Sequence, residues 1–291
     1  NRIHKMRGIV LVECDFNWYM KVVVARRMLQ SAQEKNQVPI ECFAKKGSNC
    51  INAVMTKIML CDESRIHHHP TCIGGIDFAD CYNRIAHPPA SIALQSFGVP
   101  QPAIRVLLIA MQTMRFFLRT GFGESKRSYG GSIENPTLGL GQGNAAAGPS
   151  FLAISSLIVN ANLREGHGVR TQTSLSLRPF VLAAVLYVDD TDNFHMTPQV
   201  TASIPELIQH AQYSTNVWGG LAIATGAAMK PEKCFAYFMI YPVTGGRHRL
   251  GTIEDLPSAT SLIPQDDGLP LPSHLTVPLP NGTNSPIPTL P

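Results

Sequence analysis

The sequence lacks a long apolar run and any closely paired cysteines, and each absence excludes a class of protein. No apolar stretch is long enough to span a bilayer, because the best candidate, 149–163, is short and carries Ser and Asn. The seven cysteines include no C-x-x-C pair. An odd count without framework spacing predicts free thiols in a reducing compartment, and neither a disulfide scaffold nor a zinc site. We therefore expect an intracellular protein, nuclear or cytoplasmic, with no membrane partner.

The chain also begins without an initiator methionine or a signal peptide, and we interpret it as a fragment of a longer reading frame. Its 291 residues, 44% of them apolar, suffice for one or two globular domains. The formal net charge of +4 suits a polyanionic partner, but many unrelated proteins are equally basic. Composition therefore indicates a globular protein without indicating its function.

Apolar periodicity and turn signals divide the chain into predicted elements. Helical periodicity predicts helices over 15–32, 49–60, 104–118, 149–163 and 204–223. Segments rich in β-formers predict strands over 181–187, 191–196 and 234–241. The Gly- and Ser-rich stretch 120–143 predicts turns with a hairpin. Nine of the 22 prolines lie from Pro257 onward, which predicts a linker or a disordered tail.

Paired carboxylates at a predicted turn carry the strongest chemical signal. Asp189 and Asp190 follow the strand that ends at Tyr187, and Asp77 ends an earlier apolar segment. Phosphoryl transfer to a 3′-hydroxyl needs two Mg²⁺ ions about 3.5–4 Å apart, and Mg²⁺ prefers hard oxygen ligands. A sheet that pairs these segments would bring the three carboxylates together. The alternative is ordinary turn propensity with solvated charges.

Four motifs resemble those of reverse transcriptases, and they occur in the family's order. Tyr187-Val-Asp-Asp190 resembles the Tyr-x-Asp-Asp signature, and Ile76-Asp-Phe-Ala-Asp-Cys-Tyr82 resembles the first carboxylate motif. Gly139-Leu-Gly-Gln-Gly143 resembles the Gln-Gly motif, and Thr225-Gly-Ala-Ala-Met-Lys-Pro-Glu-Lys233 resembles the later Gly…Lys motif. The similarity covers about 15–241, and residues 81–87 and 189–192 favour eukaryotic retroelements, such as those of algae.

The resemblance implies a role for each matching residue of the catalytic centre. Asp77, Asp189 and Asp190 match the catalytic carboxylates that bind metal. Lys233 matches the lysine that protonates pyrophosphate, with Lys230 as a rival for that role.

The resemblance also implies contacts with substrate. Tyr82 matches the aromatic beneath the incoming sugar, where a bulky ring would clash with a 2′-hydroxyl and favour deoxynucleotides. Gln142 and Gly143 match the motif that lies against the nascent base pair and the template, where glycine lets nucleic acid approach the backbone. Asp80 matches a variable position, and it is either a nucleotide-contacting carboxylate or a surface residue.

The segment 41–47 departs from the family pattern Gln-x-Gly-Phe-Arg-x-Gly. Lys45 stands where the arginine of the pattern reaches the triphosphate, so the cation is kept but the bidentate fork is lost. Glu41 adds a negative charge that the pattern does not have. Both differences raise the alternative of a copy that has lost efficient catalysis.

The fold implied by the resemblance is the α+β fold of a right-hand polymerase. We expect fingers and a palm, the palm being an antiparallel sheet backed by helices, and a thumb that is absent or truncated. The predicted segments are 1–72 (fingers-like), 73–97 (palm with the first carboxylate motif), 98–135 (fingers or connecting helix and turns), 136–242 (palm with the Gln-Gly and Tyr-Val-Asp-Asp motifs) and 243–291 (Pro-rich linker or disordered tail).

The function implied by the resemblance is that of an RNA-directed DNA polymerase, a nucleotidyltransferase of a retroelement. Its partners would be an RNA template, a DNA primer and a dNTP, and its cofactors two Mg²⁺ ions, with Mn²⁺ as a substitute. One alternative is a catalytically decayed, nucleic-acid-binding remnant. A nucleotide-cofactor oxidoreductase built on the Gly-rich segment ranks last, because it leaves Asp77, Asp189 and Asp190 without a role.

Overall fold

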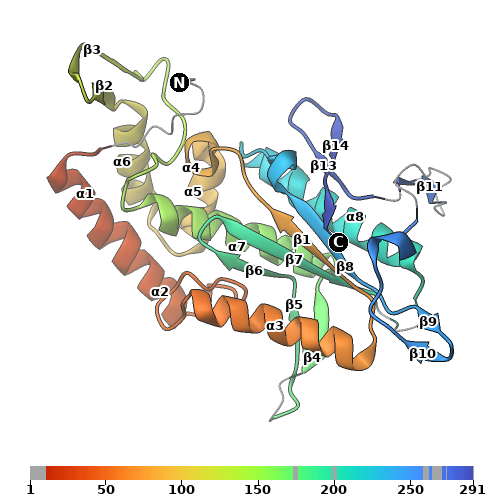
Figure 1. Cartoon of the computed structure of the whole chain (residues 1–291). Coiled ribbons are helices and arrows are strands. Elements are labelled where there is room, and N and C mark those ends of the chain that lie inside the picture. Colours follow the sequence, from red (N-terminus) through yellow and green to blue (C-terminus); the bar gives the residue numbers. More distant parts are fainter. Residues whose placement is uncertain are drawn as a thin grey trace. The chain divides into compact units, whose positions relative to one another are not determined.

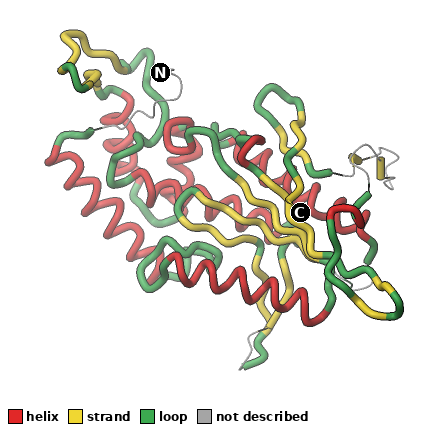
Figure 2. Tube along the Cα trace, viewed as in Figure 1, coloured by secondary structure: helices red, strands yellow, loops and turns green. Residues whose placement is uncertain are grey.

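The computed structural model describes residues 11–172, 176–197, 199, 202–257, 262–263, 271–272 and 274–290. These residues form two compact units, each built from segments far apart in the sequence. Unit 1 takes its residues from the segments 1–38, 80–155 and 225–227, and unit 2 takes the remainder. Figures 1 and 2 show the helices and strands of both units.

Unit 1 is mainly helical. Its elements are α1 (Cys14–Met20), a π-helical stretch (Lys21–Met28), α2 (Leu29–Glu34), α4 (Cys81–Arg84), α5 (His87–Ser96), α6 (Gln101–Gln112), the hairpin β2 (Arg115–Thr120) and β3 (Gly123–Gly130), and the first part of α7 (Ala147–Arg164). Proline in the first turns of α5 and α6 suits positions whose backbone N–H has no partner within the helix.

The apolar stripe predicted as a helix over 104–118 divides between two elements. Four of its members are buried on α6: Ile104, Leu107, Leu108 and Met111. The helix ends at Gln112, and Leu118 lies exposed on β2, so the prediction was wrong beyond that point. Helical and strand periods coincide over so short a run, and an isolated apolar residue cannot distinguish them.

Unit 2 is built around a five-stranded sheet in the order β15-β8-β1-β7-β6. The strands are β1 (Thr71–Ile76), β6 (Ala184–Tyr187), β7 (Asp190–Met196), β8 (Phe235–Met239) and β15 (Thr289–Leu290). All neighbours are antiparallel except β15 and β8, which are parallel. The smaller pairs are β4 (Val169–Gln172) with β5 (Pro179–Leu182), β9 (Val243–Thr244) with β10 (Arg247–His248), β11 (Leu262–Ile263) with β12 (Leu271–Pro272), and β13 (Thr276–Pro278) with β14 (Asn284–Pro286). Short 3₁₀ turns span Pro231–Lys233 and Ile253–Asp255.

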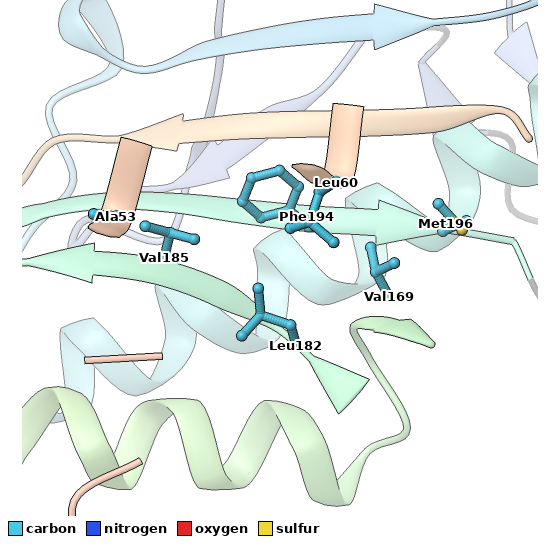
Figure 3. Close-up of a cluster of buried hydrophobic side chains, with 7 residues drawn as sticks. All are labelled: Ala53, Leu60, Val169, Leu182, Val185, Phe194 and Met196. Carbon is cyan, nitrogen blue, oxygen red and sulfur yellow. The ribbon is translucent and has the colours of Figure 1, made fainter. Parts of the chain in front are cut away.

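Two helices of unit 2 cover opposite faces of this sheet. The capping box of Asn49 with Asn52 starts α3 (Cys50–His67), and Ala53 and Leu60 of this helix pack with Phe194 of β7 (Figure 3). Neighbouring residues in a strand point to opposite faces, so His195 points away from α3 and towards α8 (Ile204–Ala224). This alternation gives the sheet one face towards α3 and another towards α8 (Figure 1).

The prediction of a linker or disordered tail over 243–291 was wrong for residues 274–290. β13 pairs with β14, β15 extends the main sheet, and Leu275 and Val277 are buried. The side chain of Gln212 accepts a hydrogen bond from the backbone N of Thr276 (2.7 Å) and donates one to its carbonyl (2.9 Å). Prolines are compatible with short edge strands, and the side chain of Gln212 on α8 supplies hydrogen bonds that the ladder lacks. Residues 258–261, 264–270, 273 and 291 lie outside the described part.

All seven cysteines are free thiols in the structure. Within the described ranges, no helix is both long and apolar enough to cross a membrane. The boundaries of the two units differ from those of the predicted fingers and palm segments. The bounds of those segments stay a prediction.

Candidate active site

The two paired carboxylates lie at the tightest turn of the main sheet. Tyr187 of β6 pairs with Asp190 of β7, so Val188 and Asp189 alone form the connecting loop. Two-residue hairpin loops require a left-handed residue at their first position. Val188 takes this conformation with φ = 63°, which is unfavourable for a β-branched side chain. The backbone is thus strained immediately beside Asp189 and Asp190, while both carboxylates remain exposed.

The register of β1 and β7 places Asp77 beside this turn. Ile73 pairs with Phe194 and Ile76 pairs with Thr191, so the same register, continued by one residue, sets Asp77 opposite Asp190. Directly opposed residues in an antiparallel pair have Cα atoms about 4.5–5.5 Å apart and point to the same face. That face is the one covered by α3, because Phe194 packs there.

The electrostatics of Asp190 show how closely the aspartates gather. Burial raises the pKa of the Asp190 carboxyl, and three neighbouring negative charges raise it further. These are the carboxylates of Asp189, Asp192 and Asp77, in decreasing order of effect, while Lys57 opposes them. Four carboxylates therefore share one end of the sheet.

Two lysines partly neutralise this cluster. The Nζ atom of Lys57 on α3 lies 2.6 Å from Oδ2 of Asp192. The Nζ atom of Lys233 lies 3.1 Å from Oδ2 of Asp77. With four carboxylates against two ammonium groups, the site keeps an excess of negative charge on the face towards α3.

The motif around Lys233 also fixes the backbone of Asp77. Lys230 donates its backbone N–H to the Asp77 carbonyl (2.9 Å), and Met229 forms an antiparallel bridge with Phe78. The buried thiol of Cys234 lies 3.5 Å from the Asp77 backbone N and 3.7 Å from its carbonyl oxygen. The later Gly…Lys motif and the first carboxylate motif are therefore neighbours, although about 150 residues separate them in the chain.

The donor chemistry of the site fits a hard divalent cation, although no preformed cage is present. Carboxylate oxygens are the ligands that Mg²⁺ prefers, and their mutual repulsion favours a cation between them. Among the described residues, no group of three or more His, Cys, Asp or Glu side chains is arranged to hold a metal ion. The convergence of Asp77, Asp189 and Asp190 is structural, and their action as metal ligands stays a prediction.

In unit 1, the Gly-rich motif lies against the helix that carries Tyr82. Leu140 donates its backbone N–H to the Tyr82 carbonyl (2.6 Å), and Gln142 donates its own to Oδ1 of Asn83 (3.3 Å). A Cβ atom on Gly139 would lie only 2.5 Å from the Asn83 carbonyl oxygen, so this approach requires glycine. The structure thus brings together Tyr82, Gln142 and the exposed Gly143, the residues for which contacts with substrate are predicted.

The ring of Tyr82 has a defined packing partner. It stands edge-on to Phe151 of α7, with ring centroids 5.5 Å apart. Asp80 precedes this helix in a left-handed conformation (φ = 49°) and is exposed. Its side chain makes no cap hydrogen bond to α4, which is compatible both with a nucleotide-contacting carboxylate and with a surface residue.

The residues of the altered fingers motif are held by structural contacts. The Nζ atom of Lys45 donates to the Pro39 carbonyl (2.8 Å), and burial lowers the pKa of Lys45. Glu41 is buried, and its Oε1 lies 3.5 Å from the backbone N of Ala183, from which it accepts a hydrogen bond. Glu41 therefore anchors its segment beside the start of β6 and does not add an exposed charge.

Two residues that sequence reasoning missed belong to the carboxylate cluster. Lys57 lies 135 positions from Asp192, and no local pattern links them. Cys234 was noticed only as a free thiol, whereas it packs against the backbone of Asp77. The strain at Val188 follows from the rule that two-residue hairpin loops need a left-handed first residue. It can be predicted from the sequence once the strand ends are known.

The structure has an α+β, polymerase-like fold, and solved structures support this description of the fold. No protein-family model matches the sequence, and no curated protein does so. Apo telomerase from Candida tropicalis, truncated from its C-terminal domain, superposes with a TM-score of 0.50 at 10% identity, covering 77% of this chain and 40% of that chain. Apo telomerase from the same organism gives a TM-score of 0.51 at 9% identity, with coverage of 80% and 39%.

The likeness to telomerase has a defined scope. Telomerase is a reverse transcriptase, and the fold of this chain is therefore reverse-transcriptase-like. At these identities the likeness establishes the fold alone. The chain spans about two-fifths of the length of the telomerase chains.

Proposed function

We propose that this chain catalyses template-directed nucleotidyl transfer as the RNA-directed DNA polymerase of a retroelement. Its fingers and palm would use an RNA template, a DNA primer and a dNTP. The observation that carries the proposal is that Asp77, directly after β1, Asp189 of the β6–β7 loop and Asp190 of β7 converge on one end of one sheet. Two Mg²⁺ ions, or Mn²⁺ in their place, would activate the 3′-hydroxyl and clamp the triphosphate there.

The lysine beside Asp77 gives the proposal a specific feature. The ammonium group of Lys233 neutralises a carboxylate that the proposal assigns to the metal. A cation that binds Asp77 would displace this ammonium group and leave it free to meet the pyrophosphate. The position of Lys233 thus suits the proton-donating role that the family resemblance assigns to it.

A second candidate is a nucleic-acid-binding protein with the same fold and without turnover. The hydrogen bond from Lys45 to the Pro39 carbonyl favours it, because a triphosphate contact would have to break that bond. The aspartates also form no preformed metal cage within the described residues. This candidate keeps the fold and the nucleic-acid partner and removes only the chemistry.

Primer extension on poly(rA) separates the two candidates. The wild-type chain should incorporate dTTP into an oligo(dT) primer when Mg²⁺ is present. Asp189→Asn keeps the size of the side chain and removes a ligand charge. It should lower incorporation by more than the roughly 10–100-fold that the loss of an outer-shell partner of a metal costs.

The matched control is Asp62→Asn on α3, where the same change falls on an aspartate that forms an ion pair with Arg65 of its own helix. This variant should extend primers as the wild type does. Equal, near-background incorporation by the wild type and by Asp189→Asn would reject the polymerase and leave the non-catalytic candidate.

A further inference from the structure

Among the described residues, no other helix or strand packs extensively against the hairpin formed by β2 and β3. Nearly every residue of both strands is exposed, and the loop at the tip, Gly121–Phe122, is fully exposed. The ladder is irregular between Phe117 and Arg119, and the backbone N–H of Leu118 donates a hydrogen bond to the hydroxyl of Ser125 (3.0 Å). An isolated two-stranded hairpin is marginally stable in water, so an exposed and ordered one suggests a ligand surface.

The charge on this hairpin is almost entirely positive. It carries Arg115, Arg119, Lys126 and Arg127, all of them exposed, against the single acid Glu124. Arg119 stands opposite Glu124 in the ladder. Within the part of the chain that the structure describes, none of the four cations forms an ion pair. The surface is therefore complementary to a polyanion.

Aromatic rings alternate with these cations. Phe117 is 52% exposed, Tyr129 is 62% exposed, and Phe122 is exposed completely at the tip. Phe116 pairs with Tyr129 across the ladder and their rings stack at 5.6 Å on one face, whereas Phe117, which pairs with Ser128, points to the other face. Interleaved aromatic and basic residues are the combination that binds single-stranded nucleic acid, because bases stack on the rings while the cations follow the phosphates.

The base of the hairpin is held firmly in unit 1. A Cβ atom on Gly131 would lie 2.1 Å from the Gln112 carbonyl oxygen, and Thr137 donates its backbone N–H to the same oxygen (3.2 Å). The amide of Gln112 donates to Nδ1 of His87 (2.9 Å), whose Nε2 donates to the Gly139 carbonyl (2.8 Å). Hydrogen bonds therefore connect Gln112, which lies just before β2, to the segment that carries Gln142.

We infer that the β2–β3 hairpin binds single-stranded nucleic acid, with phosphates on Lys126 and Arg127 and bases stacked on Phe117 and Phe122. The inference rests on the proposed function where it takes this ligand to be the unpaired template strand.

Anisotropy of labelled single strands tests the charge contribution. The probes are oligo(rU) and oligo(dT) of about 20 nucleotides, longer than the usual site of one single-strand-binding fold. Lys126→Gln/Arg127→Gln should weaken binding and lower the slope of log K against log salt by about 1.4, or about 0.7 for each lost phosphate contact. The control, Lys35→Gln/Arg164→Gln, removes the same charges from exposed positions at the ends of α2 and α7. Equal losses in both variants would assign the effect to net charge and overturn the inference.

Removal of the rings tests stacking. Phe117→Ser/Phe122→Ser should weaken single-strand binding about fivefold or more for each ring while leaving the salt slope unchanged. A duplex of the same length, whose bases are already stacked, should bind this variant as it binds the wild type. Unchanged single-strand affinity, or an equal loss for the duplex, would overturn the inference. So would a change in oligomeric state on size exclusion without a change in affinity, which would assign the rings to a protein contact.

Primer extension and single-strand binding together separate this inference from the proposed function. If the wild type fails to extend primers while the hairpin variants lose single-strand affinity, the polymerase is rejected and the hairpin site stands. If extension succeeds while those variants bind normally, the hairpin site is rejected alone. All positions changed on the hairpin are exposed, so far-UV circular dichroism should be unaltered.

Discussion

The buried ring of His195 should make unit 2 sensitive to acid. This ring lies fully inside the molecule on the α8 side of β7, and neither of its nitrogens has a hydrogen-bond partner among the described residues. Burial, with smaller contributions from the nearby rings of His210 and His167, lowers the pKa of His195 to about 3. The ring is therefore neutral in the folded chain wherever an unfolded histidine, with a pKa near 6.5, would take up a proton.

The direction and size of the effect follow from this difference in pKa. Because the folded pKa is the lower one, His195 contributes no penalty above about pH 6.5, and stability falls as the pH drops from there towards about 3. Each pH unit in that window removes about 1.4 kcal/mol for one such histidine, so about 2 kcal/mol is lost by pH 5. That is a sizeable part of the roughly 5–15 kcal/mol by which domains are stable.

Urea unfolding followed by tryptophan fluorescence measures this loss. Trp218 is buried in the same unit as His195, so its emission reports on that unit. His195→Leu should reduce the loss of unfolding free energy between about pH 7.5 and pH 5 by about 2 kcal/mol. His67→Leu, at an exposed histidine at the end of α3, should leave the loss unchanged. Equal acid sensitivity in the wild type and in His195→Leu would refute the reasoning.

Three further substitutions test the packing around the site. Gly75→Ala should lower the free energy of urea unfolding by about 1–3 kcal/mol, because the new Cβ would lie 2.2 Å from the Phe235 ring. Gly74→Ala should lower it by less, because the nearest atom to its new Cβ is 3.8 Å away. Val188→Asn should raise the unfolding free energy by about 1 kcal/mol, since Asn tolerates the left-handed conformation, while Val188→Ala should not match it. Gln212→Leu should lower it by about 1–3 kcal/mol by leaving the backbone groups of β13 unpaired; an unchanged midpoint would contradict that pairing.

The helices and strands of this fold were largely predictable because their signals are local. The helix predicted over 204–223 is α8, and the strand predicted over 191–196 is β7. The short turn between Tyr187 and Asp190 was predictable for the same reason, since β-rich segments flank it.

Features that depend on distant pairing were not predictable. The order of strands places β1 between β7 and β8, and only this order sets Asp77 opposite Asp190. The pairing of Lys57 with Asp192 needs the same tertiary information. The structure of residues 274–290 was missed because a high proline content was interpreted as disorder, whereas Gln212 of α8, 64 residues before Thr276, supplies hydrogen bonds to this segment.

The parallel pairing of β15 with β8 has a consequence for how the chain can be shortened. Thr289 and Leu290 pair with Ala236 and Tyr237, and the Pro288 carbonyl accepts the N–H of Ala236. A chain truncated near Tyr241, where the motifs stop, would leave this edge of β8 unpaired. Unpaired strand edges are templates for self-association. A shortened protein should therefore aggregate even though every motif residue is retained. Residues 289–290 thus protect one edge of the sheet that leads to Asp77 against self-association.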